Sequence, residues 1–227
     1  MAVAPKSLTP EIEKMLASAT RKRFAPKSLI VHEGETPTEL FFILRGSVTV
    51  LMEDPDGREL ILSYLGPGEF FGELGLFSTT AKRSAYVGAR SDCEVAQIGY
   101  ERFKQLIREQ PELLLQLTAQ IAERLRATSE KLGHLAFLDV TGRIARALLQ
   151  LVSDSQAISH PNGMLVRITR EELGRLVNCS AKMTGKVLRN LEEQGLIQVR
   201  GKSIVVIGVA PGDSAPPGSA DTGKRDT

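Results

Sequence analysis

The sequence has little of what metal and redox sites are built from. It contains two cysteines far apart in the chain, Cys93 and Cys179, and three scattered histidines. None of them has the short spacing typical of metal ligands, and no nucleophile–base pair or phosphate-binding P-loop is present. We therefore expect no metal site, no redox function and no enzymatic activity.

Long apolar runs are missing too. No run reaches the roughly 18 apolar residues from which a transmembrane helix is predicted, and the N-terminus Met-Ala-Val-Ala-Pro-Lys lacks the apolar core of a signal peptide. We therefore expect a cytoplasmic protein. The chain has 227 residues, 42% of them hydrophobic and 25% charged, which is enough for two soluble domains.

Charge is distributed unevenly along the chain. Residues 1–139 hold 17 Lys and Arg against 19 Asp and Glu, whereas residues 140–209 hold 10 against 5. A basic segment beside a slightly acidic one is typical of a separate nucleic-acid-binding module. The charge pattern thus indicates such a module in the C-terminal half.

Short β-rich runs separated by turn residues fill the N-terminal half. The predicted strands cover residues 29–31, 40–44, 47–51, 59–64 and 94–98. Between the third and fourth runs, Asp56-Gly57 is a typical hairpin turn. Strands that recur at such intervals favour an antiparallel barrel or jelly roll.

A long amphipathic helix is predicted from about Pro111 to about Phe137. Its apolar residues recur in steps of three, four and seven at Leu114, Leu117, Ile121, Leu125, Leu132 and Leu135. Such a helix is too long to be buried only against a small β-domain. We expect it to pair with the same helix of a second subunit in a homodimer; a helix lying across its own domain is the open alternative.

The segment Gly72-Glu73-Leu74-Gly75-Leu76-Phe77, followed by Arg83-Ser84, offers what a cyclic phosphate needs. Arg83 can supply a guanidinium, and Ser84 and backbone N–H groups near Gly72 can donate hydrogen bonds. Glycines let the backbone approach a ligand closely, and Glu73 can accept a hydrogen bond from a ribose hydroxyl.

This segment resembles the phosphate-binding cassette of cyclic-nucleotide-binding domains, in particular that of the cyclic AMP receptor protein (CRP/FNR) family of bacterial transcription regulators. The resemblance runs from about Leu8 to Gly208 and includes the segments 62–65, 93–96 and 135–143. It implies an α+β fold with an N-terminal β-jelly-roll, a long dimerisation helix and a C-terminal winged helix-turn-helix. It also implies cyclic AMP as the allosteric effector.

The resemblance assigns the effector site residue by residue. The implied cyclic AMP contacts are Leu62, Ser63, Gly72, Glu73, Leu74, Arg83, Ser84, Thr128 and Ser129. In the family the adenine is held by the Thr-Ser pair of the long helix, with the serine supplied by the other subunit. Effector binding is then expected to reorient the C-terminal domains about the hinge Asp139-Val140-Thr141.

The C-terminal half carries the signals of a helix-turn-helix. Thr169-Arg170-Glu171-Glu172 has the capping-box pattern at the start of one helix. Asn178-Cys179-Ser180 predicts a tight turn before a second helix from Ala181 to about Glu193, which is expected to bury Met183, Val187, Leu188 and Leu191. Residues 196–207, with Arg200-Gly201-Lys202 at the turn, predict a wing.

The expected DNA contacts are Thr141, Arg170, Ser180, Ala181, Lys182, Lys186, Arg189 and Lys202. Of these, Arg170, Ser180 and Lys202 are placed to hold phosphates of a palindromic, double-stranded operator. The family usually has Arg-Glu after the capping serine and a further Arg four residues beyond that Glu, where this chain has Ala181, Lys182 and Lys186. We therefore expect an altered or relaxed operator preference.

The predicted organisation is a cyclic-nucleotide-binding β-domain (1–110), a dimerisation helix and hinge (111–138), a winged helix-turn-helix (139–209) and a disordered tail (210–227). Ser159-His160-Pro161-Asn162-Gly163 resembles the surface loop through which the family contacts RNA polymerase. Two alternatives stay open: a regulator of this family that answers another nucleotide, such as cyclic GMP, or none, and a nucleotide-binding module that acts by protein contact with weak DNA specificity.

Overall fold

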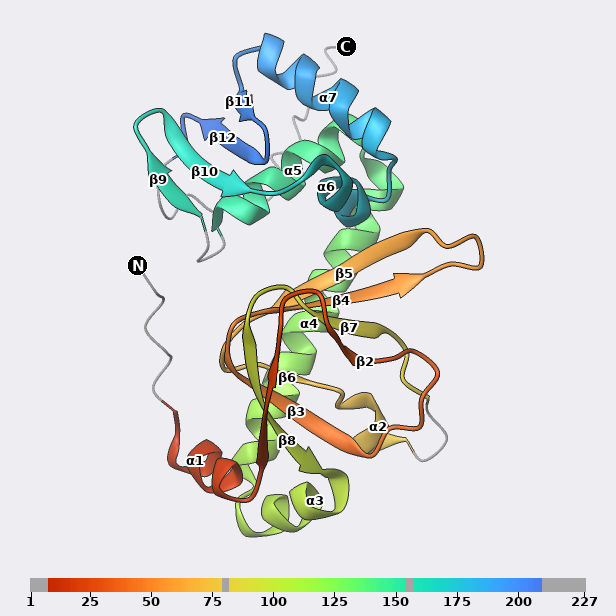
Figure 1. Ribbon diagram of the computed structural model, residues 1–227, viewed down its shortest axis with the longest axis vertical. Coiled ribbons are helices and arrows are strands. Elements are labelled where there is room, and N and C mark those ends of the chain that lie inside the picture. Colours follow the sequence, from red (N-terminus) through yellow and green to blue (C-terminus); the bar gives the residue numbers. More distant parts are fainter. Residues whose placement is uncertain (1–7, 79–81, 154–156, 210–227) are drawn as a thin grey trace, which may run out of the picture. The chain divides into compact units, whose positions relative to one another are not determined.

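The computed structural model describes residues 8–78, 82–153 and 157–209. The chain forms two compact units that divide between Gly133 and His134. Each unit has its own strands and helices (Figure 1), and each has its own buried apolar side chains. Within the described ranges, no helix is both long enough and apolar enough to cross a membrane. The predicted disordered tail lies outside the described residues.

Two four-stranded antiparallel sheets make up the N-terminal unit. One sheet has the order β1 (Thr20–Phe24), β8 (Cys93–Gly99), β3 (Glu39–Arg45) and β6 (Phe70–Phe71). The other has the order β2 (Leu29–Val31), β7 (Tyr86–Ala89), β4 (Val48–Glu53) and β5 (Glu59–Leu65). Side chains from both sheets share one buried cluster, so the predicted jelly roll is confirmed.

Alternation along β3 shows how this unit builds two cores. Phe41 and Ile43 pack with side chains of the other sheet, whereas Leu40 and Phe42 belong to a second cluster together with the helices. These helices are α1 (Pro10–Ala17), α3 (Tyr100–Glu109) and α4 (Glu112–Phe137). Because successive side chains of a strand point to opposite faces, β3 can serve both cores.

The β4–β5 hairpin has two special points. At its tip, Asp54 Oδ1 accepts hydrogen bonds from the backbone N–H groups of Asp56 (3.0 Å) and Arg58 (2.9 Å), and Gly57 has a φ of +77°. Further down, the register shifts between Val50 and Leu51, so that Leu62 is left out of the pairing as a β-bulge. The predicted Asp56-Gly57 turn is confirmed.

The C-terminal unit packs three helices on one small sheet. Its helices are α5 (Val140–Ser153), α6 (Arg170–Val177) and α7 (Ala181–Glu193). The antiparallel sheet has the order β11 (Ile197–Arg200), β12 (Ser203–Ile207), β10 (Gly163–Arg167) and β9 (Ile158–His160). One buried cluster joins α5, α6, α7 and the sheet. The predicted helix-turn-helix and its β-hairpin wing are confirmed.

The segment expected to be a surface loop at residues 159–163 is the largely exposed end of a tight hairpin. Ser159 and His160 lie in β9, Gly163 begins β10, and the strands pair through His160–Gly163 and Ser159–Met164. Gly163 has a φ of +149°, and a Cβ there would lie 1.9 Å from the carbonyl oxygen of Val206. Only glycine permits β10 to approach β12 so closely at this point.

Candidate functional site

Arg83 is held in place by three oxygen atoms. Its Nη1 donates to the Gly72 carbonyl (2.9 Å) and to the Tyr100 hydroxyl (3.2 Å), and its Nη2 donates to the Glu39 carbonyl (2.8 Å). The guanidinium carbon also lies 5.6 Å from the centre of the Phe41 ring. The structure thus fixes this half-buried cation beside Gly72.

The glycines of the segment are required by close contacts. Gly72 has a φ of +80°, and a Cβ there would lie 2.6 Å from Arg83 Nη1. A Cβ at Gly75 would lie 2.7 Å from the Tyr100 hydroxyl. The short helix α2 (Leu74–Phe77) begins between these two contacts. The segment can therefore follow this path only if neither position carries a side chain.

Tyr100 is a site residue that the sequence did not reveal. Its hydroxyl donates to the Gly72 carbonyl at 2.5 Å, and burial raises the pKa of this phenol. The hydroxyl therefore keeps its proton and links the start of α3 to the Gly72 segment. The only local signal is that Tyr100 follows the predicted strand at 94–98.

Glu73 faces a second arginine. Arg124 of α4 places Nη1 at 3.4 Å from Glu73 Oε2 and Nη2 at 3.7 Å from Glu69 Oε1, and it donates to the Phe70 carbonyl. Sequence reasoning missed Arg124 as well, although it lies one helical turn before Thr128. The carboxylate expected to accept a ribose hydroxyl is thus oriented by a cation from α4.

Helix α4 has two neighbouring faces. The first, called here the domain face, packs on the β-domain through Leu113, Leu117, Gln120, Arg124 and Lys131. The second, called the open face, is exposed and carries Thr118, Leu125, Thr128 and Leu132 in steps of seven, three and four. Leu125 and Leu132 are each 67% exposed, whereas Leu117, expected in the same apolar stripe, is fully buried against its own domain.

Lys131 ties the domain face to the bulge in β5. Its Nζ donates to the carbonyl of Ile61, directly before Leu62 and Ser63. Burial lowers the pKa of this ammonium to about 8. The strand that carries two predicted effector contacts is therefore attached to the helix that carries Thr128 and Ser129. Those two residues, and Leu74 and Ser84, are exposed.

The turn between α6 and α7 follows the predicted caps. The Thr169 hydroxyl accepts from Glu172 N (3.0 Å), and the Ser180 hydroxyl accepts from Met183 N (3.2 Å). Asn178 adopts the left-handed conformation, with φ 53° and ψ 59°. A Cβ at Gly174 would lie 2.5 Å from the Cys179 carbonyl, so the two helices meet in close contact.

The exposed face of α7 differs from the prediction at one residue. Lys182, Lys186 and Arg189 are exposed as expected. Met183, which was expected to be buried, is 42% exposed. The interior position belongs to Thr184, which is fully buried and donates its hydroxyl to the Ser180 carbonyl at 3.1 Å. Burial of Met183 was therefore a wrong prediction.

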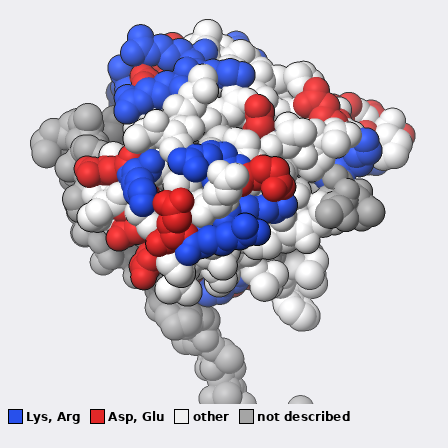
Figure 2. All heavy atoms as spheres, turned by 90° about the horizontal axis from the view of Figure 1, so that it is seen from below, with Lys and Arg blue, Asp and Glu red and all other residues white. Residues whose placement is uncertain are grey.

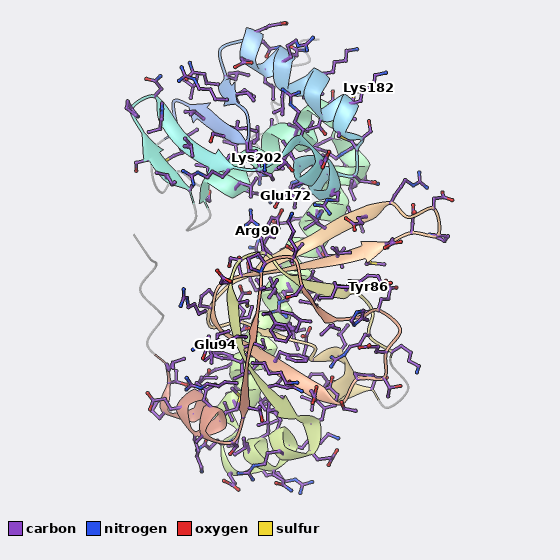
Figure 3. The ribbon with its side chains drawn as sticks, in the orientation of Figure 1. Tyr86, Arg90, Glu94, Glu172, Lys182 and Lys202 are labelled. Carbon is purple, nitrogen blue, oxygen red and sulfur yellow. The ribbon has the colours of Figure 1, made fainter. Side chains whose placement is uncertain are left out.

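Basic side chains lie at the start of α7, alongside it and in the wing. Lys182 stands at the beginning of this helix and Lys202 at the turn between β11 and β12 (Figure 3). The backbone N–H of Ile168 donates to the Lys202 carbonyl (2.9 Å), which fixes the wing beside α6. A Cβ at Gly185 would lie 3.7 Å from Arg170 Cδ and Nη1, so Arg170 runs alongside α7.

The N-terminal unit has a surface of mixed charge around α1 and α3. Acidic and basic side chains lie close together on the face seen in Figure 2. Exposed ion pairs such as Lys14–Glu109 (3.2 Å) and Lys104–Glu101 (2.8 Å) occur on α1 and α3. In the described parts of the chain, no three His, Cys, Asp or Glu side chains are grouped as a metal site would require.

Two family models match this chain. The model described as a cyclic nucleotide-binding domain matches residues 21–110, and the model described as a Crp-like helix-turn-helix domain matches residues 142–210. The cAMP-activated global transcriptional regulator Vfr of Pseudomonas aeruginosa is 52% identical over 200 residues, which cover 87% of this chain and 94% of Vfr. The cAMP-activated global transcriptional regulator CRP of Escherichia coli is 48% identical over 208 residues, covering 92% and 99%.

A solved structure agrees with these matches. The c-di-GMP responsive global regulator CLP of Xanthomonas campestris superposes with a TM-score of 0.83 at 41% identity, over 87% of this chain and 98% of that one. The resemblance stated from the sequence is thereby confirmed.

Proposed function

This chain belongs to the CRP family of transcription regulators, and on that premise we propose that it is a homodimer that binds cyclic AMP and then double-stranded DNA. One observation carries the effector half of the proposal. Arg83 is a half-buried cation held at Gly72 by fixed hydrogen bonds, in a chain about half identical to regulators named as cAMP-activated. An anion placed there meets a charge that is already oriented.

The proposed nucleotide contacts divide among three elements. Arg83, Ser84 and the backbone of the 72–74 segment hold the cyclic phosphate, and Glu73 accepts the ribose hydroxyl. Thr128 of one subunit and Ser129 of the other hold the adenine, and Leu62 and Ser63 border it. Support comes from the links between these elements, because Arg124 joins α4 to Glu73 and Lys131 joins α4 to β5.

The open face of α4 is the proposed dimer seam. Leu125 and Leu132 are spaced seven residues apart and are both largely exposed in the single chain, which is the pattern of a two-helix coiled coil. Thr128 lies between them. A polar residue in such a seam needs a partner, and the adenine supplies one. Effector binding and dimer geometry would then be coupled through one helix.

DNA binding uses the exposed face of α7, the wing and Arg170. We propose that cyclic AMP changes the orientation of the two helix-turn-helix domains about the hinge at Asp139-Val140-Thr141. The protein would work in the cytoplasm, and the hairpin with Ser159, His160 and Gly163 would contact RNA polymerase. Equal affinity for operator DNA with and without cyclic AMP would contradict the coupling.

A different cyclic nucleotide is the main alternative, because one similar structure is described as c-di-GMP responsive. Isothermal titration with cyclic AMP, cyclic GMP and c-di-GMP separates these effectors. We expect micromolar binding of cyclic AMP that is lost in Arg83→Ala. The matched control is Arg58→Ala, which removes an exposed arginine at the tip of the β4–β5 hairpin. Binding of none of the three would refute the effector proposal.

A further inference from the structure

The first two turns of α7 present only hydrogen-bond donors and apolar groups to solvent. Among the described residues 181–186, the exposed side chains are those of Ala181, Lys182, Met183 and Lys186. Thr184 is fully buried and Gly185 has no side chain. An ammonium group donates hydrogen bonds and cannot accept them. This part of the helix therefore offers no acceptor from an exposed side chain.

Three nearby side-chain acceptors, those of Ser180, Thr184 and Asn190, are already engaged, and the exposed Asn178 caps α6, outside the helix that enters the groove. The Ser180 hydroxyl accepts from Met183 N at 3.2 Å, and the Thr184 hydroxyl is bonded inside the turn. The Asn190 side-chain carbonyl accepts from Gln194 Nε2 at 2.7 Å. The exposed Glu171 lies on α6, and the first helix of a helix-turn-helix crosses the phosphate backbone rather than entering the groove.

The major groove offers a distinct pattern for each base. Guanine presents two acceptors, N7 and O6, whereas cytosine and adenine each present an amino donor, and thymine presents a methyl group. Lysine can donate to both guanine acceptors, and apolar side chains contact the thymine methyl. Positive selection of cytosine or adenine through the amino group needs an acceptor, and residues 181–186 supply none.

We propose that α7 selects its half-site through guanine, contacted by Lys182 and Lys186, and through thymine methyls, contacted by Met183 and Ala181, without positive selection of the amino groups of adenine or cytosine. The inference rests on the proposed function and adds the chemical class of the operator to it. Arg170, alongside Gly185, and Lys202 of the wing add phosphate contacts that strengthen binding to all sequences alike.

The first experiment selects half-sites from random duplexes with the full-length protein saturated with cyclic AMP. We expect each selected position to depend either on the N7 and O6 acceptors of a guanine or on the methyl group of a thymine. Replacing a selected G·C pair by A·T raises the Kd about 5- to 150-fold, the range of a lost bidentate base contact. Replacing a selected thymine by deoxyuridine removes one methyl group and raises the Kd about fourfold.

Two variants assign these effects to side chains. Met183→Ser replaces an exposed apolar side chain by a polar one. It is expected to abolish the rise in Kd that deoxyuridine causes at one thymine. Lys182→Gln introduces an acceptor, and we expect it to gain selection of adenine at one position. Lys202→Ala is the control, because loss of a phosphate contact lowers the affinity for every duplex by the same factor.

The outcomes separate the inference from the function on which it rests. A selected G·C pair that stays selected in both Lys182→Ala and Lys186→Ala, or a deoxyuridine penalty unchanged in Met183→Ser, would overturn the inference while leaving a DNA-binding regulator. No enrichment of any sequence, with or without cyclic AMP, would instead overturn the proposed function.

Discussion

Substitution of Gly72 by alanine is expected to weaken cyclic AMP binding by displacing one side chain. The new Cβ would lie 2.6 Å from Arg83 Nη1, and 3.2 Å from the Glu39 carbonyl oxygen and a Phe41 ring carbon. The guanidinium is the most mobile of these groups, so Arg83 moves and loses its bonds to Gly72 and Glu39. The displaced guanidinium also loses a hydrogen bond to the cyclic phosphate, and a hydrogen bond to a charged group contributes about 1.5–3 kcal/mol. We therefore expect cyclic AMP to bind about 10- to 150-fold more weakly.

The substitution also strains the backbone, and Gly68 supplies the matched control. Gly68 has a φ of +88°, close to the +80° of Gly72, but a Cβ there meets no atom within 4 Å. Either alanine costs about 1–2 kcal/mol in the free energy of unfolding through the left-handed conformation. Only Gly72→Ala displaces Arg83. The difference in Kd for cyclic AMP between the two variants thus reports the effect of moving the guanidinium.

The assay combines isothermal titration with urea unfolding of both variants. We expect Gly72→Ala to lose more stability than Gly68→Ala, because Arg83 gives up its bonds to Gly72 and Glu39, and to have a much larger Kd for cyclic AMP. Equal affinities would show that the position of Arg83 does not control binding, and the phosphate assignment would be wrong.

Further predictions concern the seam, a buried amine and the hairpin of the C-terminal unit. Leu125→Lys is expected to give monomers in sedimentation experiments, whereas Leu115→Lys, outside the open face, leaves a dimer; a dimeric Leu125→Lys protein would refute the seam. Burial lowers the pKa of Lys131 from 10.5 to about 8, so above pH 8 the unfolded chain holds more protons than the folded one. The free energy of unfolding therefore gains up to about 1.4 kcal/mol per pH unit from this group between pH 8 and 10.5, a slope that Lys131→Met removes and that urea unfolding at each pH measures. Gly163→Ala forces a Cβ to 1.9 Å from the Val206 carbonyl and is expected to destabilise the C-terminal unit by about 3 kcal/mol; unchanged melting would show that the strands separate at no cost.

The elements with strong local signals were predictable. Strands such as β3 and β8 are apolar and bounded by turn residues, and the α6–α7 turn follows capping rules that the structure confirms at Thr169, Asn178 and Ser180. By contrast, β1 is Thr-Arg-Lys-Arg-Phe, an exposed edge strand whose identity depends on pairing with β8. No local sequence pattern predicts such a strand, and β6, with two residues, is too short to have a recognisable pattern.

The missed site residues share a physical cause. Tyr100 and Arg124 act through contacts with Gly72 and Glu73, far away in the sequence, so their roles appear only once the chain has folded. Met183 was misjudged because methionine is apolar. The buried position goes to Thr184, whose hydroxyl can be satisfied by the preceding turn.

Helix α4 also limits how this chain can change during evolution. Each residue added to an α-helix turns everything after it by about 100° relative to what lies before it. A single insertion between Gln120, which bonds to Gly68 and Phe70, and Thr128 would turn Thr128 and Leu132 further away from the β-domain and would bring Lys131, which bonds to Ile61, round to the open face. Point substitutions there can be tested one at a time by selection, but changes of length must come in nearly whole heptads. We therefore expect related sequences to vary in residue type along α4 while keeping its length between these two positions unchanged.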